Sequence, residues 1–230
     1  MLVSFAESAR YYRHPEKVEV VGMPVRKAFI STRKAAARAE LGLDDRPLVV
    51  SAFGSLGAEA MNHVIADMLQ IEKENGFPFQ HIHATGTFGW EWMPGKLDEM
   101  GLTQETCPGV DVREYIYNMP TVMAAADVII SRAGASSCNE IGASGTPCVL
   151  IPSPNVTNNH QEKNARILES RGAAMVLTEP ECTAQKLYET VQALLADPQQ
   201  RRDMSVALRN MVVLDSADRI CDMIEELSLR

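Results

Sequence analysis

The stretch DVIISRAGASSCNEIGASGTPCVLIP, residues 127–152, holds two short runs of β-branched and apolar residues, with a small-residue turn and a helical segment between them. A strand, a helix and a second strand in this order form a βαβ unit with parallel strands. These two strands are expected at 127–131 and 147–152, and further strands at 47–53, 79–85, 110–116 and 173–177. The pattern predicts an α/β fold, in which a Rossmann-like parallel sheet is sandwiched by helices.

Helical patterns fill the segments between these strands. A long helix is expected at 58–75, because apolar residues recur there in steps of three and four. Another is expected at 158–172, which begins on polar residues and ends on glycine. From Thr183 onward three helical stretches follow without a strand, broken near 197–198 and 215–216. The C-terminal tail is therefore expected to be all-α.

Composition narrows the class of protein. The 230 residues carry a formal net charge of −8, which argues against a general nucleic-acid binder. No apolar run approaches the roughly 18 residues that a membrane helix needs, and the first residues do not have the pattern of a secretory signal. The five cysteines are an odd number without a C-x-x-C pair. They are expected to be free thiols in a reducing cytoplasm.

A glycine turn at AFGSLGAEA, residues 52–60, leaves a predicted strand and opens the long helix. Free N–H groups at a helix start attract phosphate when no bulky side chain blocks the approach. Gly54 and Gly57 keep that approach open, and Ser55 adds a hydroxyl. The alternative is a tight strand-to-helix turn that binds nothing.

A second turn of this kind is SRAGASSCNE, residues 131–140, with Gly134 and Ala135 at its centre. Ser137 and Glu140 have the spacing of a capping box, in which each side chain binds the main-chain amide of the other residue. That alternative explains two residues without a ligand. It leaves the small residues before them unexplained.

The two turns both follow the carboxyl ends of predicted parallel strands and are therefore expected at the same edge of the sheet. Ligands of doubly wound folds bind at this edge. Together they predict a diphosphate site. Glu140, one helical turn deeper, is placed to bind the hydroxyls of a ribose. We therefore expect nucleotide binding, which would be excluded if the two turns lay at opposite ends of the sheet.

A third edge loop, PSPNVTNNHQEKNA at 152–165, is rich in amide side chains, which both donate and accept hydrogen bonds and so suit hydroxyl-rich ligands. His160, Gln161 and Asn164 are its candidates, with a helix cap or a solvated face as the alternative. His81 and His83 share one face of a predicted strand, but nothing nearby completes a metal site. No metal is expected.

Four segments carry a family resemblance: GMPVR (22–26), FGSLGAEAMN (53–62), SRAGASSCNE (131–140) and IPSPNVTNNHQEKNA (151–165). In this order they resemble the donor-binding half of the MurG family, which belongs to glycosyltransferase family 28. Members transfer N-acetylglucosamine from UDP-N-acetylglucosamine to undecaprenyl-pyrophosphoryl-MurNAc-pentapeptide, a step of peptidoglycan synthesis. The resemblance implies one half of a GT-B fold and a metal-free hexosyltransferase.

The resemblance also implies roles at matching positions on the phosphate side of the donor. Arg26 would lie near the phosphates, and Ser55 with its turn would contact the diphosphate. Asn62 would support this turn from the helix behind it. Ser136 and Ser137 would line the phosphate side of the second turn.

The nucleoside and the sugar would be bound by other positions, again as the resemblance implies. Ile116 would present its backbone to the uracil, with Met119 beside it. Glu140 would bind the ribose. The remaining candidates would address the sugar: His160, Gln161 and Asn164.

Several positions depart from the family pattern. The first turn is often Gly-Gly-Ser-Gln-Gly, whereas Phe53 and Leu56 occupy its first and fourth places here, so a glutamine contact is lost. Met23 replaces an asparagine in the N-P-V-R-like motif. Ser136 and Ser137 stand where small hydrophobic or methyl-bearing residues are common.

Family members also have a first domain, which binds the lipid acceptor and supplies the proposed catalytic histidine. No counterpart is visible here. Residues 1–21, with strand-like runs at 2–5 and 18–21, resemble the end of that domain and the linker, and residues 22–230 resemble the donor domain. We therefore expect a donor-binding part that is inactive alone and lies in the cytoplasm, peripheral at the inner membrane face once joined to an acceptor part.

Three alternatives stay open at this point. The upstream half of a transferase is absent from the chain, or the chain works with a separate acceptor-binding protein, or it is an epimerase of the same architecture. Strand 2–5 and the α-helical tail have apolar edges that a partner domain would cover. Such edges favour self-association, so a homodimer through the N-terminal end is a further expectation.

Overall fold

The computed structural model describes residues 1–4, 6–103 and 105–229. Its centre is a six-stranded, all-parallel sheet in the order β5-β4-β3-β6-β7-β8. The predicted fold class is confirmed, and each predicted strand of the sheet is present, although β5 ends before 116. The bounds are β3 (Leu48–Ala52), β4 (Gln80–Ala84), β5 (Val110–Arg113), β6 (Val128–Ser131), β7 (Cys148–Leu150) and β8 (Met175–Val176).

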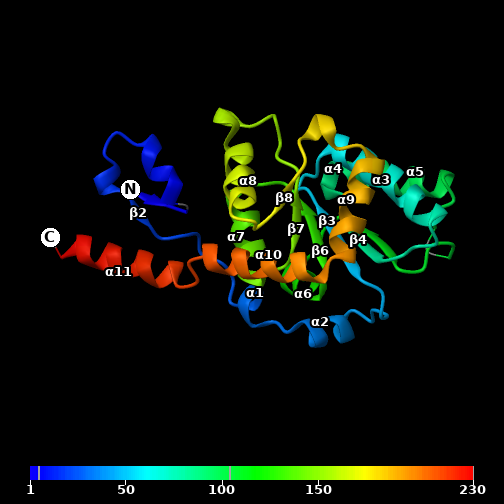
Figure 1. Cartoon of the computed structure of the whole chain (residues 1–230), viewed down its shortest axis with the longest axis horizontal. Coiled ribbons are helices and arrows are strands. Elements are labelled where there is room, and N and C mark those ends of the chain that lie inside the picture. The colour runs from blue at the N-terminus through cyan, green and yellow to red at the C-terminus, as the bar shows by residue number, and fades with distance from the viewer. Residues whose placement is uncertain (5, 104, 230) are drawn as a thin grey trace.

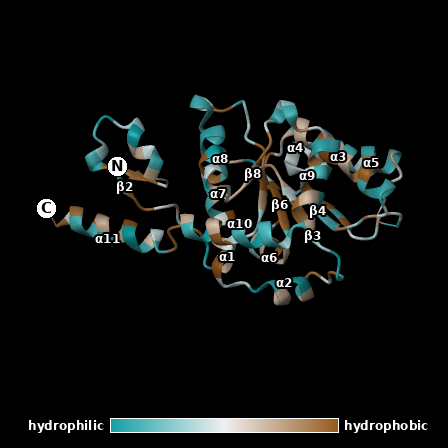
Figure 2. Ribbon diagram, viewed as in Figure 1, coloured by the Kyte–Doolittle hydropathy of each residue, from teal (hydrophilic) through white to brown (hydrophobic). Residues whose placement is uncertain are grey.

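Helices cover both faces of the sheet, as Figure 1 shows. One face packs against α3 (Glu59–Glu74) and α9 (Ala184–Ala196), which also contact each other. The other face packs against α6 (Met119–Ala125), α7 (Ala135–Ser144) and α10 (Pro198–Met211). The strands between them are the most hydrophobic part of the chain, and most of their residues are buried (Figure 2).

The remaining helices connect or flank these layers. Four of them, α1, α2, α4 and α5, have only one or two turns. Helix α8 begins later than the predicted 158, because Asn158 and Asn159 adopt positive φ angles of 56° and 52°. Their bounds are α1 (Ala28–Ser31), α2 (Lys34–Glu40), α4 (Gly86–Trp90), α5 (Met93–Glu99), α8 (His160–Ser170) and α11 (Ser216–Ser228), with 3-10 turns at Ala6–Tyr11, Pro15–Lys17, Thr157–Asn159 and Glu179–Glu181.

The C-terminal tail consists of α9, α10 and α11, so the predicted all-α tail is confirmed. The predicted break between the first two helices has a clear local cause. Asp197 accepts hydrogen bonds from the amides of Gln199 and Gln200 at 3.0 and 2.9 Å, and Pro198 begins α10. An aspartate cap followed by proline is a strong helix start.

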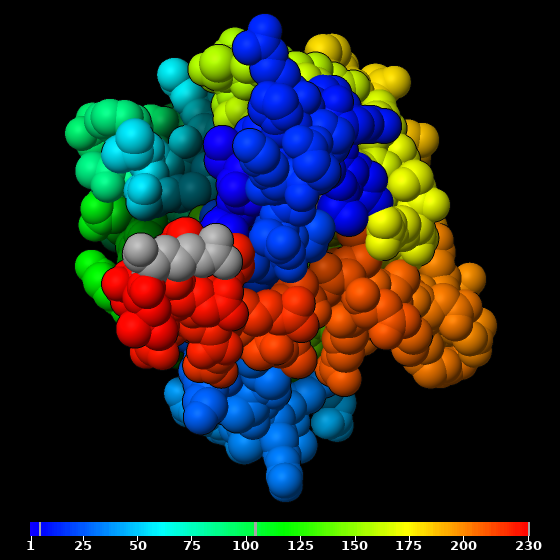
Figure 3. Space-filling view, turned by 90° about the vertical axis from the view of Figure 1, so that its left-hand side faces the viewer, coloured from blue at the N-terminus to red at the C-terminus, as the bar shows by residue number. Residues whose placement is uncertain are grey.

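The first 21 residues lie beside the main sheet rather than in it. Here β1 (Leu2–Val3) pairs in parallel with β2 (Glu19–Val20), in a separate two-stranded sheet. The predicted strand 2–5 is thus shorter than expected, and its Phe5 lies outside the described residues. This segment and α11 are adjacent at one end of the molecule (Figures 1 and 3). Large exposed apolar side chains gather in these elements: Met1, Leu2, Tyr11, Leu214, Ile224, Leu227 and Leu229.

Among the described residues, no helix has the length and apolar character that crossing a bilayer requires. All five cysteines are free thiols, as predicted, and only Cys221 is exposed.

Candidate functional site

A cavity of about 150 Å³ opens at the carboxyl ends of β4, β3 and β6, which are neighbours in the sheet. Ala52, Ala84 and Ser131, the last residues of these strands, form its floor. Small residues here leave room above the sheet. Both glycine turns rise from this edge, so the turns lie at the same end of the sheet as predicted.

The first turn is closed by a hydrogen bond from the Gly57 amide to the Gly54 carbonyl, at 3.1 Å. Within the described residues, the amides of Ser55 and Leu56 donate to no main-chain carbonyl. Gly54 and Ser55 line the cavity, and a Cβ added at Gly54 would meet open space. The turn therefore offers bare amides on an unobstructed side.

Gly57 has a different reason to be glycine. It has a positive φ of 82°, and a Cβ there would lie 2.0 Å from the carbonyl oxygen of Thr85. The first turn thus packs main chain against main chain on the turn after β4. Asn62 strengthens this contact, since it is buried and its side-chain amide donates to the Thr85 carbonyl at 2.8 Å. Asn62 supports the turn from α3, as the family resemblance implies.

The second turn begins α7 at Ala135, with Gly134 as the N-cap residue. No side chain caps this helix, so the capping-box alternative for Ser137 and Glu140 is wrong. The physical reason is register: Ser137 is already the third residue of the helix, where a side chain cannot serve as the cap. The main-chain amides in the first turn of α7 therefore remain available to a ligand.

The serines of this turn point in different directions. Ser137 lines the cavity together with Glu140. Ser136 is exposed outside it, and its hydroxyl contacts the Met23 sulfur at 3.3 Å. Only one of the two predicted serines therefore lines the cavity.

Arg26 and Glu140 provide the charges of the cavity. Arg26 comes from the loop before α1, and its guanidinium lies 5.1 Å from the centre of the Phe29 ring. Burial raises the pKa of Glu140, and the positive charge of Arg26 acts in the opposite direction. A partly buried carboxylate gains most from a ligand that donates hydrogen bonds to it.

The segment between β5 and α6 forms the third wall. Ile116 is fully buried, and Met119 begins α6; both line the cavity, and their contact with a uracil stays a prediction. Tyr115 is 46% exposed and also lines the cavity. Sequence reasoning missed several lining residues, although most sit where a strand ends or a neighbouring turn begins: Ala52, Ala84, Tyr115, Met123 and Ser131.

The three candidates from the third loop lie outside the cavity lining. The His160 ring contacts the Thr157 carbonyl at 3.0 Å, and the Gln161 side chain accepts from the Ser153 amide at 3.0 Å. Asn164 donates to the Ala133 carbonyl at 3.0 Å and so ties the loop to the second turn. Their contacts with a sugar stay a prediction.

His81 and His83 share one face of β4, as predicted, but they lie in the core on the side of α3. The hydroxyl of Ser51 contacts both rings at 2.7 Å, and the other nitrogen of His81 contacts Glu72 at 2.8 Å. Burial lowers the pKa of His83 to about 3. These histidines form a buried hydrogen-bonded chain away from the cavity.

The fold and the cavity define the class: a Rossmann-like α/β domain with two uncapped helix starts and an arginine–glutamate pair at the carboxyl edge of its sheet. Residues 48–220 match the Glycosyltransferase family 28 C-terminal domain, and the chain belongs to this family.

Curated relatives agree with the family. The UDP-N-acetylglucosamine--N-acetylmuramyl-(pentapeptide) pyrophosphoryl-undecaprenol N-acetylglucosamine transferase of Thermoanaerobacter sp. is 39% identical over 227 residues, which is 98% of this chain. The chain spans only 61% of that relative's length.

Solved structures share the fold. Acinetobacter baumannii MurG superposes with a TM-score of 0.71 at 24% identity, over 91% of this chain and 56% of MurG. A UDP-N-acetylglucosamine 2-epimerase from Listeria monocytogenes, described as putative, superposes with a TM-score of 0.67 at 14% identity, over 94% of this chain and 55% of that one. At these identities the likeness concerns the fold alone, since one fold hosts different reactions.

Proposed function

We propose that this chain is the UDP-N-acetylglucosamine-binding part of a glycosyltransferase that adds N-acetylglucosamine to undecaprenyl-pyrophosphoryl-MurNAc-pentapeptide. One observation carries the proposal: the first glycine turn, the first turn of the uncapped helix α7, Arg26 and Glu140 line a single cavity. The reaction is the one that the name of the Thermoanaerobacter relative states.

The diphosphate is the leaving group of such a transfer, and its charge must be stabilised as the glycosidic bond breaks. The free amides of the first turn and of the α7 start, together with Arg26, are suited to this task. They are held in place before the ligand arrives, because Gly57 packs directly on the turn after β4. No metal is needed for this arrangement.

The cavity itself is sized for the nucleoside. At about 150 Å³ it is smaller than the roughly 300 Å³ or more of pockets that hold a whole drug-sized ligand. Glu140 binds the ribose hydroxyls, and the main chain at Ile116 reads the uracil. The ring of Tyr115 offers a stacking surface for the base. The sugar then extends over the third loop, toward His160, Gln161 and Asn164.

The acceptor hydroxyl must also lose a proton, which requires a base. Of the described residues that line the cavity, none is a histidine, and Glu140 is engaged by the ribose. We assign the base and the lipid acceptor to the part of the relatives that extends beyond this match. That part is joined to residues 1–21 or supplied by a separate protein, and the exposed apolar end near α11 is where it would pack. With it, the enzyme works in the cytoplasm at the inner membrane face.

Calorimetry with UDP, UDP-N-acetylglucosamine and ADP tests the proposal. We expect both uridine nucleotides to bind and ADP to bind at least tenfold more weakly. The chain alone should leave UDP-N-acetylglucosamine unchanged. Absence of binding heat from the folded protein would refute donor binding, and conversion of the sugar to its C2 epimer would refute the transferase assignment.

A further inference from the structure

A second cavity lies at the opposite edge of the sheet, at the amino ends of β6 and β7. Its volume is about 330 Å³, and α1, the start of α2, the end of α7 and one side of α10 form its walls. We call it the basal pocket. Its apolar walls include Phe29, Ile30 and Pro147. None of its lining residues belongs to the cavity between the glycine turns.

Cationic side chains dominate this pocket. Four line it, Lys34, Arg201, Arg202 and Arg209, against a single carboxylate, Asp127. The whole chain carries a formal charge of −8, so this concentration of positive charge runs against the overall composition. A recess lined by one sign of charge raises the local concentration of the opposite ion.

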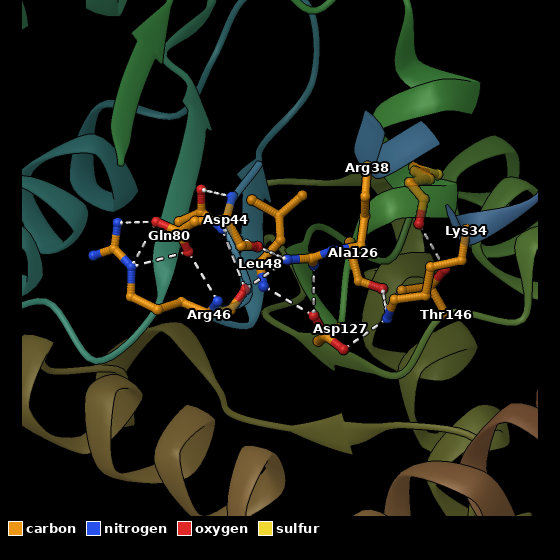
Figure 4. Close-up of polar contacts among 10 residues, drawn as sticks. Lys34, Arg38, Asp44, Arg46, Leu48, Gln80, Ala126, Asp127 and Thr146 are labelled. Atoms are coloured by element: carbon orange, nitrogen blue, oxygen red, sulfur yellow. Dashed lines mark hydrogen bonds and ion pairs between the residues drawn. The ribbon is translucent and has the colours of Figure 1, made fainter. Parts of the chain in front are cut away.

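Asp127 does not neutralise the arginines of the pocket, because its oxygens are used elsewhere. They accept from Lys34 Nζ at 2.6 Å, from Arg38 at 3.4 Å and from the Leu48 amide at 2.9 Å (Figure 4). Lys34 also donates to the Ala126 carbonyl at 3.0 Å. Lys34 and Asp127 thus form an ion pair whose other hydrogen bonds go to the main chain and to Arg38, and this ion pair holds the edge of the sheet in place.

The three arginines have no carboxylate within ion-pair distance among the described residues. Each is positioned by neutral oxygens instead. Arg201 donates to the last carbonyls of α9, including Leu194 at 3.0 Å. Arg202 donates to the Gln199 side chain at 2.7 Å, and Arg209 reaches the Ser144 carbonyl at 3.4 Å. A guanidinium has five N–H donors, so each keeps donors for a ligand.

Basic and acidic side chains lie on different sides of α10. The residues of this helix that line the basal pocket are Pro198, Arg201, Arg202, Ser205 and Arg209, spaced along one face. Asp197 and Asp203 line a different hollow, beside β8. The acidic side chains of the helix are thus directed away from the arginines.

We propose that the basal pocket binds a soluble, phosphate-bearing small molecule. Forked guanidinium groups match the oxygens of a phosphate, and Arg201, Arg202 and Arg209 are placed to supply them. Phe29 and Ile30 provide an apolar wall for an organic group on the phosphate. The ligand is therefore a phosphate ester. A bilayer headgroup fits the site poorly, because the arginines line a recess between helices.

Calorimetry with phenyl phosphate and with inorganic phosphate is the test. The wild-type chain should bind phenyl phosphate more tightly than inorganic phosphate, because only the ester reaches the apolar wall. The double variant Arg202→Gln, Arg209→Gln should weaken phenyl phosphate binding at least tenfold. A matched double variant, Arg13→Gln with Arg219→Gln, removes the same charge from exposed positions and should change the affinity less than twofold.

Two further variants and measurements separate the outcomes. Arg26→Gln, in the donor cavity, should leave phenyl phosphate binding unchanged; loss in this variant alone would place the ester at the donor turns and overturn the proposal. Equal losses in the two double variants would mean diffuse surface charge, which also overturns it. Binding of the wild type to phosphatidylglycerol vesicles but not to phenyl phosphate would do the same.

Amide chemical shifts keep the test independent of whether the Arg202/Arg209 variant folds. Phenyl phosphate added to wild-type protein should shift the amides of 144–146, at the floor of the basal pocket. It should leave those of 54–57 in place. The reverse pattern would contradict the proposal.

Discussion

Replacing Glu140 by glutamine should separate ligand binding from stability, because the two respond in opposite directions. The substitution keeps the size of the side chain and removes only its charge. A hydrogen bond to a charged group contributes about 1.5–3 kcal/mol. If the ribose donates to this carboxylate, the loss of that energy should weaken UDP binding by about 10- to 150-fold.

The effect of Glu140→Gln on thermal stability should be opposite to its effect on UDP affinity. Burial raises the pKa of Glu140 in the folded chain. A raised carboxyl pKa favours the fold at low pH, and this contribution is lost as the pH rises through the raised value. At neutral pH the ionised side chain therefore destabilises the folded chain while the cavity is empty. The glutamine variant should melt at the same temperature as the wild type or slightly above it.

The assay is titration of UDP by calorimetry from pH 4.5, the ordinary pKa of a glutamate carboxyl, up to pH 8, with thermal unfolding of each variant. Wild-type affinity should rise with pH as Glu140 ionises, after subtraction of the change seen in Glu140→Gln, which reports the titration of UDP itself. Glu99→Gln, at an exposed position of α5, is the matched control and should behave as wild type. Equal UDP affinity in Glu140→Gln and wild type would refute the role of this carboxylate, and a lowered melting temperature would refute the electrostatic argument.

Three other substitutions test the same architecture. Gly57→Ala should lower the free energy of unfolding by about 2 kcal/mol or more, since its Cβ would lie 2.0 Å from a carbonyl oxygen at a positive φ. Gly95→Ala, inside α5 with open space for its Cβ, should leave the free energy of unfolding in urea unchanged or raise it by up to about 1 kcal/mol. Burial lowers the pKa of His83 to about 3, so the free energy of unfolding of the wild type should fall as the pH drops below about 6.5, by at most about 1.4 kcal/mol per pH unit. In urea unfolding between pH 7 and 5, His83→Gln should make this pH dependence weaker, whereas His63→Gln should leave it as in the wild type. Arg26→Gln should weaken UDP about tenfold and leave uridine affinity unchanged in calorimetry, because only UDP carries the diphosphate; a parallel loss for uridine would count against its phosphate role.

The sequence predicted the sheet well because its strands are short and lie between segments with a clear helical periodicity. It also placed the two glycine turns at one edge, a consequence of parallel strands that holds for any strand order. It could not predict that β3 and β6 are direct neighbours, and this adjacency makes one cavity of the two turns.

The capping-box alternative at the start of α7 was wrong, and the reason was the register of the helix. The spacing of Ser137 and Glu140 fits a capping box, but the helix starts three residues earlier than that motif requires. Gln161 and Asn164 each make a hydrogen bond to the main chain of a neighbouring loop, which the sequence could not show, and their contacts with a sugar stay a prediction. The sequence of a polar loop does not show which of its side chains bind other groups of the same protein.

Donor binding and transfer place different demands on the fold, and the proposed donor cavity is built within one domain. Apart from Arg26, which comes from the loop before α1, the residues that line this cavity come from strand ends and turns of the sheet or from helices packed on it. The Gly57 contact and the Asn62 hydrogen bond fix the first turn without help from another domain. A preformed anion site of this kind loses little entropy on binding. Nucleotide affinity should therefore survive in the chain alone, whereas transfer depends on a base and an acceptor that must approach the open side of the same turns.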